Sequence, residues 1–233
     1  MTYWNGNIIG KRISVAPGAV SGIFNLQSHT PYINDAKWPR SFVFTLGGLA
    51  GKIFAGDFRN TIAAGNIGSI PLTTANDAPS GFPSGTKGIP SGYNSGVNIW
   101  DEIDFGNNLS NTYGFIAIGY FKAPATGTFD FDTTSDDGSG VWIGANALET
   151  GNRTSGNAVV NNGMGTGHGT QTRDGSISLT QDVFYPIRVV HEEGGGGDNM
   201  RFRWRVSGGT YSTDLSQYYY HATVNNVITG DFT

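Results

Sequence analysis

Several features that often decide the class of a protein are missing from this sequence. The 233 residues include no cysteine, which excludes disulfide bridges and thiolate metal sites. Only 14% of the residues are charged and the formal net charge is −4, so the chain lacks the basic surface that holds a nucleic-acid backbone. We therefore expect no nucleic acid among its partners.

Long apolar segments are missing as well. No stretch approaches the roughly 18 consecutive apolar residues of a membrane-spanning helix. The first residues, Met1 to Asn7, lack a basic start followed by an apolar run. We expect neither a signal peptide nor membrane insertion. A protein that works outside a cell then needs another route, such as release by lysis with a virus particle.

Known catalytic motifs are also absent from the sequence. Neither a Gly-x-Ser-x-Gly nucleophile motif nor a Walker loop occurs. The histidines lie far apart without metal-ligand spacing, at His29, His168, His191 and His221. We therefore expect structural roles for the histidines and no enzyme activity.

Glycine, by contrast, is abundant. The 36 glycines and the 12% aromatic residues are typical of many short strands joined by tight turns, which predicts an all-β protein. The run Tyr113 to Phe121 is apolar almost throughout, which suits a strand buried on both faces. The stretch Ser41 to Phe58 suits one or two further strands.

The second half of the chain carries the clearest strand pattern. Phe129 and Phe131 alternate with aspartates, and Val141 to Ile143 follow a Gly-rich turn, so we expect a hairpin-like pair. Further strands are predicted around Ile177 and Leu179, at Phe184 to Val190, and at Met200 to Val206.

The last predicted strand alternates strictly. Its apolar residues face one way and its arginines the other, at Arg201, Arg203 and Arg205. We interpret this stripe as a solvated strand face, and a surface for acidic glycans is the alternative.

The first 40 residues look different from the rest. Trp4, Phe24, Tyr32 and Trp38 follow neither a helical nor an alternating period, and prolines interrupt them. We expect residues 1–40 to form an extended N-terminal assembly arm and residues 41–233 to form an antiparallel β-sandwich.

Two adjacent carboxylates, Asp136 and Asp137, stand at a predicted strand end before a Gly-rich turn. Neighbouring strand residues point to opposite faces, so both can bind one ion only if the backbone is distorted, as by a cis peptide bond. Carboxylate oxygens are the ligands that Ca²⁺ selects. An ordinary Asp-Asp-Gly turn is the alternative.

A second polar segment, His191 to Asn199, follows the strand at Phe184 to Val190. It contains four consecutive glycines, whose carbonyls no side chain shields. Glu193 and Asp198 flank the glycines with further anionic oxygens. The segment is therefore a candidate for binding an ion or a ligand, and a flexible hairpin tip is the alternative.

In their order and spacing these segments resemble the PA14/GLEYA β-sandwich modules of yeast flocculins, adhesins and phage proteins. The resemblance runs from about Tyr113 to Val206. It rests on Ser135-Asp136-Asp137-Gly138, Val141-Trp142-Ile143-Gly144, Tyr185-Pro186-Ile187-Arg188 and the Gly-rich loop.

The resemblance implies a calcium-dependent lectin site. In such lectins the paired aspartates, joined by a cis peptide, bind Ca²⁺, and sugar hydroxyls complete the coordination shell. The implied metal ligands are the side chains of Asp136, Asp137 and Glu193 and the carbonyls of Gly195 and Gly197. The implied ligand-binding residues are Asp136, Asp137, Glu193, Asp198 and Asn199. Glu193 stands where these lectins usually have Asn, and Asp198 or Asn199 is the alternative third ligand.

A shorter segment bears on location. Ser21 to Gln27, followed by Lys37-Trp38-Pro39, is similar to a segment of virion and tail-associated proteins of marine phages. We therefore expect a homo-oligomeric virion structural protein, a capsid decoration, fibre or tail-associated protein, on the particle surface. It would contact other virion proteins through the arm and bind a host cell-surface glycan. The alternatives are a purely structural decoration or adaptor protein and a cell-surface adhesin module.

Overall fold

The computed structural model describes residues 42–57, 96–106, 112–148, 153–224 and 227–228. The predicted assembly arm at residues 1–40 lies outside these ranges. The division of the chain into an arm and a sandwich at residue 40 therefore stays a prediction.

The described residues form strands and two short 3-10 helices, and this confirms the expected all-β class. The strands are β1 (Phe42–Leu46), β2 (Leu49–Ala55), β3 (Asn98–Trp100), β4 (Asp104–Gly106), β5 (Tyr113–Lys122), β6 (Gly127–Asp136), β7 (Ser139–Ile143), β8 (Val160–Asn162), β9 (Gln171–Leu179), β10 (Phe184–Glu193), β11 (Asn199–Val206), β12 (Tyr219–Val224) and β13 (Val227–Ile228). The helices are η3 (Gly144–Ala147) and η4 (Ser155–Asn157). None of the helices in these ranges has the length and apolar character needed to span a membrane.

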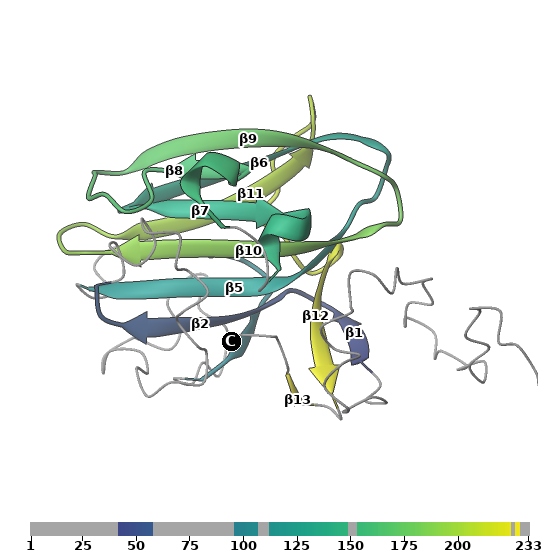
Figure 1. The fold of residues 1–233 in the computed structure, drawn as a ribbon, viewed down its shortest axis with the longest axis horizontal. Coiled ribbons are helices and arrows are strands. Elements are labelled where there is room, and N and C mark those ends of the chain that lie inside the picture. Colours follow the sequence, from purple (N-terminus) through teal and green to yellow (C-terminus); the bar gives the residue numbers. More distant parts are fainter. Residues whose placement is uncertain (1–41, 58–95, 107–111, 149–152, 225–226, 229–233) are drawn as a thin grey trace, which may run out of the picture.

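The strands make two sheets, which lie as two layers in Figure 1. The larger sheet has the order β1-β12-β5-β10-β7-β8, with β2 and β3 joined at β5 and β13 at β12. The smaller sheet has the order β4-β11-β6-β9. Neighbouring strands pair antiparallel, for example β5 with β10 and β6 with β11. The predicted antiparallel β-sandwich is confirmed.

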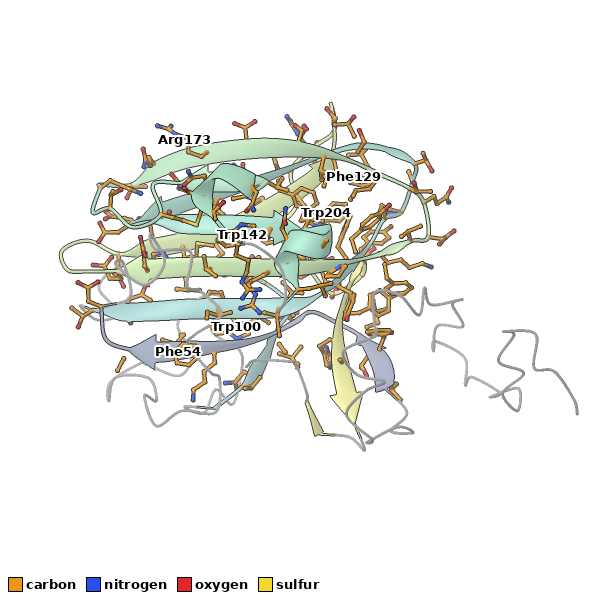
Figure 2. All side chains as sticks on the ribbon, viewed as in Figure 1. Phe54, Trp100, Phe129, Trp142, Arg173 and Trp204 are labelled. Carbon is orange, nitrogen blue, oxygen red and sulfur yellow. The ribbon has the colours of Figure 1, made fainter. Side chains whose placement is uncertain are left out.

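Aromatic rings fill the space between the sheets. The Phe121 ring of β5 lies 5.0 to 5.6 Å, between centroids, from the rings of Phe129, Phe131, Trp204 and Tyr219. Figure 2 labels two of these, Phe129 and Trp204, which come from β6 and β11 of the smaller sheet. Edge-to-face ring pairs of this kind add about 0.5–1.5 kcal/mol each beyond their buried area. This cluster holds the two sheets together.

Strand β5 is buried on both faces over its first half, as its apolar sequence predicts. Phe115 and Ala117 point into the main core. Ile116 points the other way and packs in a second cluster with Phe54 and Trp142. From Ile118 onward the strand is only half-buried on that outer side.

Strand β12 passes very close to β5. A Cβ atom at Gly119 would lie 2.3 Å from the carbonyl oxygen of Tyr220, so only glycine fits there. In Figure 1, β1 and β12 run across the direction of β5 and β10. The large sheet is thereby extended away from the sandwich.

One topological expectation is wrong. The strands at Phe129–Phe131 and Val141–Ile143 do not pair as a hairpin, because β6 belongs to the smaller sheet and β7 to the larger one. The chain changes sheets within Asp136-Asp137-Gly138. Asp136 and Asp137 therefore stand at an end of the sandwich where the two sheets are connected.

Candidate ion and ligand site

Three segments meet at one end of the sandwich, on the left in Figure 1. They are the β6–β7 connection with the two aspartates, the β10–β11 loop after Glu193, and the β8–β9 loop at residues 163–170. The first two carry the site residues that the sequence predicts. The third carries none of them.

The structure brings Asp136, Asp137 and Glu193 together. One carboxylate oxygen from each lies within 4.8 Å of the others. The peptide bond between Asp136 and Asp137 is cis. Asp136 is half-buried, whereas Asp137 and Glu193 are 4% and 0% exposed. The cluster thus has one partly open side, at Asp136.

Backbone N–H groups hold the Asp137 carboxylate. His168 N–H donates to its Oδ1 at 2.8 Å, and Gly194 N–H donates to its Oδ2 at 3.0 Å. The Asp137 N–H in turn donates to Glu193 Oε2 at 3.1 Å. The residue is thereby tied to both neighbouring loops.

Burial makes the charges in this cluster costly. It raises the pKa of Glu193 to about 7, and the negative charge of Asp137 adds to this rise. Burial, followed by the charge of Asp137, also raises the pKa of Asp136. The Gly195 N–H donates to Glu193 Oε1 and partly offsets the effect on that carboxyl. The cluster therefore favours either protons or a cation.

The glycine loop lies against this cluster. Gly195 and Gly196 have φ angles of +141° and +111°, which L side chains rarely adopt. A Cβ atom at Gly197 would lie 3.3 Å from Asp136 Oδ2, so the backbone passes beside that carboxylate. The roles of the Gly195 and Gly197 carbonyls as metal ligands stay a prediction.

The structure separates the two alternative ligands, Asp198 and Asn199. Asp198 is 3% exposed, and its Oδ2 accepts a hydrogen bond from the Tyr113 hydroxyl at 3.3 Å. Asn199 Nδ2 donates to Thr170 Oγ1 at 2.7 Å, and that hydroxyl donates to Asp136 Oδ2 at 3.4 Å. Asn199 therefore lies at the exposed rim and Asp198 beneath the site.

A buried polar layer supports the site, and it was not predicted from the sequence. His191 is fully buried, and burial lowers its pKa to about 3, so its ring is neutral. Its Nε2 lies 3.3 Å from the Tyr113 hydroxyl and its Nδ1 3.1 Å from the Gly138 carbonyl oxygen. Burial and the nearby Asp198 raise the pKa of Tyr113 well above its usual value. His191 has the structural role that we expected.

The contribution of the β8–β9 loop was missed altogether. Its His168 N–H and Thr170 hydroxyl contact the paired aspartates, although neither residue belongs to a recognisable motif. A contact made by a backbone N–H does not require a particular side chain, so it cannot be recognised from the residue type. The only signal was a stretch rich in glycine and threonine, which is typical of any surface loop.

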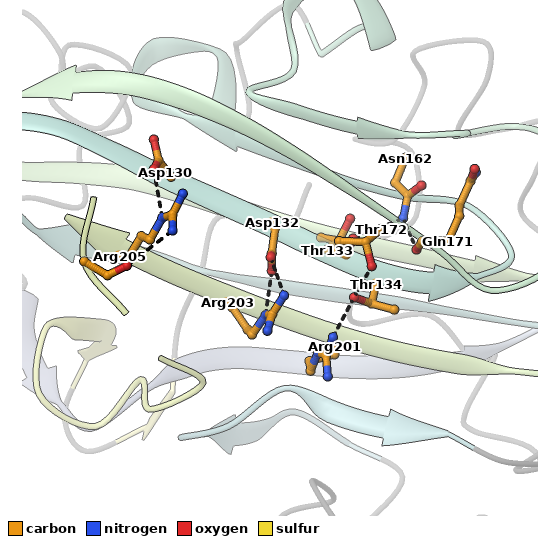
Figure 3. Close-up of polar contacts among 11 residues, drawn as sticks. Asp130, Asp132, Thr133, Thr134, Asn162, Gln171, Thr172, Arg201, Arg203 and Arg205 are labelled. Carbon is orange, nitrogen blue, oxygen red and sulfur yellow. Dashed lines mark hydrogen bonds and ion pairs between the residues drawn. The ribbon is translucent and has the colours of Figure 1, made fainter. Parts of the chain in front are cut away.

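The arginine stripe of β11 is not simply solvated. Arg203 makes two hydrogen bonds to the Asp132 carboxylate, at 3.0 and 2.6 Å, and Arg205 Nε lies 2.9 Å from Asp130 Oδ2 (Figure 3). Arg201 donates to Thr134 Oγ1 at 3.0 Å. The arginines lie on the half-exposed outer face of β11, as the alternation predicts, and β6 presents their partners directly opposite.

Comparison with known families gives one match. A family described as the GLEYA domain matches residues 113–206, the part that contains the paired aspartates, Glu193 and Asn199. A search of curated protein sequences finds no match.

Several solved structures are similar in fold. The epithelial adhesin 6 A domain from Candida glabrata, crystallised with Galb1-3GlcNAc, is 18% identical with a TM-score of 0.49, over 75% of this chain and 87% of that one. The PA14 sugar-binding domain from an RTX adhesin is 20% identical with a TM-score of 0.49, over 76% and 99%.

A longer protein is similar as well. An anti-sigma factor domain-containing protein from Clostridium clariflavum is 14% identical with a TM-score of 0.48, over 75% of this chain and 47% of that one. The chain thus spans about half of that protein's length. These likenesses leave the ligand of this chain open.

Proposed function

We propose that the chain is a calcium-assisted glycan-binding protein, and the match of residues 113–206 to the GLEYA domain supports this proposal. The observation that carries the proposal is the cluster of Asp136, Asp137 and Glu193 oxygens at the end of the sandwich. The cluster lies in the matched segment and has a partly open side.

The donor set fits Ca²⁺. All three side chains offer oxygen, the ligand that this hard cation prefers. Oxygens that share one calcium ion at about 2.3–2.6 Å can lie at most about 5 Å apart. The three oxygens, all within 4.8 Å of one another, meet this limit. Asp136, Asp137 and Glu193 would hold the ion, with Gly195 and Gly197 as candidate carbonyl ligands.

A glycan has an open approach at the rim. When bound, the ion would supply a positive centre on which two vicinal sugar hydroxyls complete the coordination shell. Asp136 is half-buried and the loop glycines Gly195 to Gly197 are exposed, so the chain leaves room on that side. The amide of Asn199 stands beside Asp136 at the same rim and can bond a further hydroxyl.

The geometry favours binding over glycoside hydrolysis. Acid and base carboxyls of glycosidases stand about 5–10 Å apart across a cleft, so that substrate or water fits between them. One oxygen from each of Asp136, Asp137 and Glu193 lies within 4.8 Å of the others, so the three carboxylates point to a common position and do not face one another across a cleft. We therefore propose that the protein is not an enzyme.

Glycan-array binding in millimolar calcium and in EDTA tests this function. The wild-type protein should bind a set of glycans in calcium and lose them in EDTA. Asp137→Asn should lose them in both buffers, because it removes a buried anionic ligand. Asp174→Asn is the matched control, since it removes an exposed carboxylate of β9 away from the cluster and should bind as wild type. Glycan binding that is equal in EDTA and in calcium would contradict the proposal.

Sequence features support a proposal for the assembly in which this protein works. The segment at Ser21 to Gln27 and the aromatic residues of the first 40 positions support a virion protein that attaches a particle to host glycans. A cell-surface adhesin module fits the GLEYA domain equally well. Deleting residues 1–40 separates the two, because a virion protein should then keep glycan binding and fail to enter particles. Normal incorporation would argue against an assembly arm.

A further inference from the structure

We propose that the β8–β9 loop, residues 163–170, is a third wall of the ion site and that Asn162 is the positioning residue that holds this wall against the paired aspartates. The inference rests on the proposed calcium role of Asp136 and Asp137. It concerns residues that belong to none of the motifs on which the family resemblance stands.

Asn162 is the last residue of β8, and its side chain is completely buried. Its Nδ2 lies 3.3 Å from the carbonyl oxygen of Thr133, 3.0 Å from Ser135 Oγ and 3.1 Å from the carbonyl oxygen of Gln171. Two carbonyl oxygens fix the amide orientation, because only the nitrogen can donate to them. One side chain thus joins β6 and β9 to the end of β8, as Figure 3 shows for Asn162 and Gln171.

Two of these contacts lead along the chain to the ion site. Ser135 directly precedes Asp136, so the bond to its hydroxyl fixes the strand end that carries the aspartates. Gln171 directly follows Thr170, whose hydroxyl donates to Asp136 Oδ2 at 3.4 Å. Asn162 therefore anchors both sides of the contact between Thr170 and Asp136.

A third connection runs through His168. Its Nε2 lies 3.1 Å from the backbone oxygen of Asn162, and its N–H donates to Asp137 Oδ1 at 2.8 Å. The loop bends back on itself here, since a Cβ atom at Gly163 would lie 2.5 Å from the His168 ring. The loop is thus closed at Asn162 and presents the His168 N–H to Asp137.

The floor beneath the loop is a buried hydroxyl cluster. Ser135 Oγ lies 2.7 Å from Ser139 Oγ, which donates to Thr133 Oγ1 at 2.8 Å. All three side chains are completely buried, and Asn162 lies opposite Ser139 in the pairing of β7 with β8. This cluster joins the residues on both sides of the aspartates, where the chain changes sheets.

The arrangement has the character of an outer coordination sphere. Groups that orient metal ligands typically change metal affinity by about 10- to 100-fold when they are removed. A residue that only supports the fold would instead lower thermal stability equally with and without metal. Calcium affinity and stability in EDTA therefore separate the two roles.

The central experiment compares Asn162→Ala with Asn157→Ala. Asn157 is the matched control, because its Oδ1 accepts from Trp142 Nε1 at 3.1 Å and from Thr154 N–H at 2.9 Å, which ties it to β7 and to the start of η4. Both variants should melt lower in EDTA. Isothermal titration should show a calcium dissociation constant raised at least about tenfold in Asn162→Ala and unchanged in Asn157→Ala.

A second readout needs no calcium. In EDTA, the amides of His168 and Gly165 should exchange with solvent faster in Asn162→Ala than in wild type and keep their protection in Asn157→Ala. The His168 amide donates to Asp137 and the Gly165 amide to Glu192 Oε1, so both report on the closed loop. Unchanged protection of both amides would overturn the positioning role.

Thr170→Val covers the case in which Asn162→Ala fails to fold. Thr170 is exposed, and valine keeps its shape while removing the hydroxyl that contacts Asp136 and Asn199. Calcium affinity should fall roughly three- to tenfold, as for the loss of one hydrogen bond. A wild-type calcium affinity in this variant would contradict the proposal that the β8–β9 loop is part of the ion site.

The outcomes also distinguish this inference from the function on which it rests. If the wild-type protein binds no calcium, the proposed function and the inference fall together. If the wild type binds calcium and Asn162→Ala and Thr170→Val bind it equally well, only the inference falls.

Discussion

Two regions of this molecule contain clustered carboxylates, and they differ in the groups that surround those negative charges. On the outer face of the smaller sheet, Asp130 and Asp132 lie opposite Arg205 and Arg203 on the neighbouring strand (Figure 3). At the end of the sandwich, the described partners of Asp136 and of Glu193 are neutral hydroxyl and N–H groups. The first region neutralises itself, whereas the second concentrates negative charge.

The difference shows what each region is suited to do. Tyr211 also covers the ladder of ion pairs, with its ring 4.8 Å from the Arg203 guanidinium and 4.2 Å from that of Arg205. Such a face is complete without a ligand and serves stability. At the end of the sandwich, burial and then the charge of Asp137 raise the pKa of Asp136 and of Glu193, so the proposed cation would offset the cost of these charges.

The largest expected effect is that calcium stabilises the fold. Binding to the native state alone contributes about 2.7 kcal/mol at a hundredfold excess over the dissociation constant, or roughly 5–10 °C in melting temperature for a chain of this size. Calorimetry in EDTA and in calcium measures the shift. Asp136→Asn should lose most of it, and equal melting temperatures of the wild type in both buffers would remove the contrast between the regions.

A paired substitution gives a smaller effect of opposite sign in the two regions. In EDTA, Asp132→Asn should cost about 1–2 kcal/mol, because it leaves the half-buried Arg203 without its anion. Asp136→Asn should be neutral or slightly stabilising in the same buffer, because it removes a charge that burial and Asp137 disfavour. Urea unfolding measures both variants. A loss of equal size in the two would show that the cluster is not repulsive.

The smallest expected effect is the pH response of the ladder. The Ser176 hydroxyl, followed by Arg205, lowers the pKa of Asp130, so its ionised form stabilises the folded state. This contribution is complete above the ordinary aspartate pKa and is lost as the pH falls through the lowered folded-state value. In EDTA, Asp130→Asn should be less stable than wild type by less than about 1 kcal/mol at pH 6.

Acid unfolding in urea checks the sign of that response. The gap between Asp130→Asn and wild type should close as the pH falls below the usual aspartate range. A gap that widens toward low pH would mean that the Asp130 charge is unfavourable in the fold, as it is in the cluster.

Much of the fold could be predicted from the sequence, because successive residues of a strand face opposite sides of the sheet and burial therefore alternates with a period of two. The alternation of Phe129 and Phe131 with aspartates, and of Phe202 and Trp204 with arginines, gave β6 and β11 with the correct faces. At the end of β11 the pattern fails, since Val206 is 43% exposed. Periodicity says which face is buried, but it cannot say how far the partner strands reach.

The pairing of strands was harder to predict from the sequence. Val141 to Ile143 read as the partner of the strand before it, yet β7 pairs with β10 and β8 in the other sheet. A short Gly-rich connection permits either a hairpin or a change of sheet. The choice depends on which sheet the apolar side chains of β7 complete, and that is a property of the whole core.

The candidate site divides in the same way. Asp136, Asp137 and Glu193 were predicted from the sequence, because carboxylates beside glycines are candidate ion ligands and the family resemblance points to the same residues. Asn162, His168 and Thr170 carry none, since they act through a buried amide, a backbone N–H and a loop hydroxyl. The residue pattern alone was enough to predict the all-β class, the faces of the main strands and the carboxylates of the candidate site. The passage of the chain from one sheet to the other at Asp136 and Asp137, and the contacts of the β8–β9 loop with them, could be seen only in the folded protein. Contacts between segments distant in sequence are set by the packing of the complete sandwich.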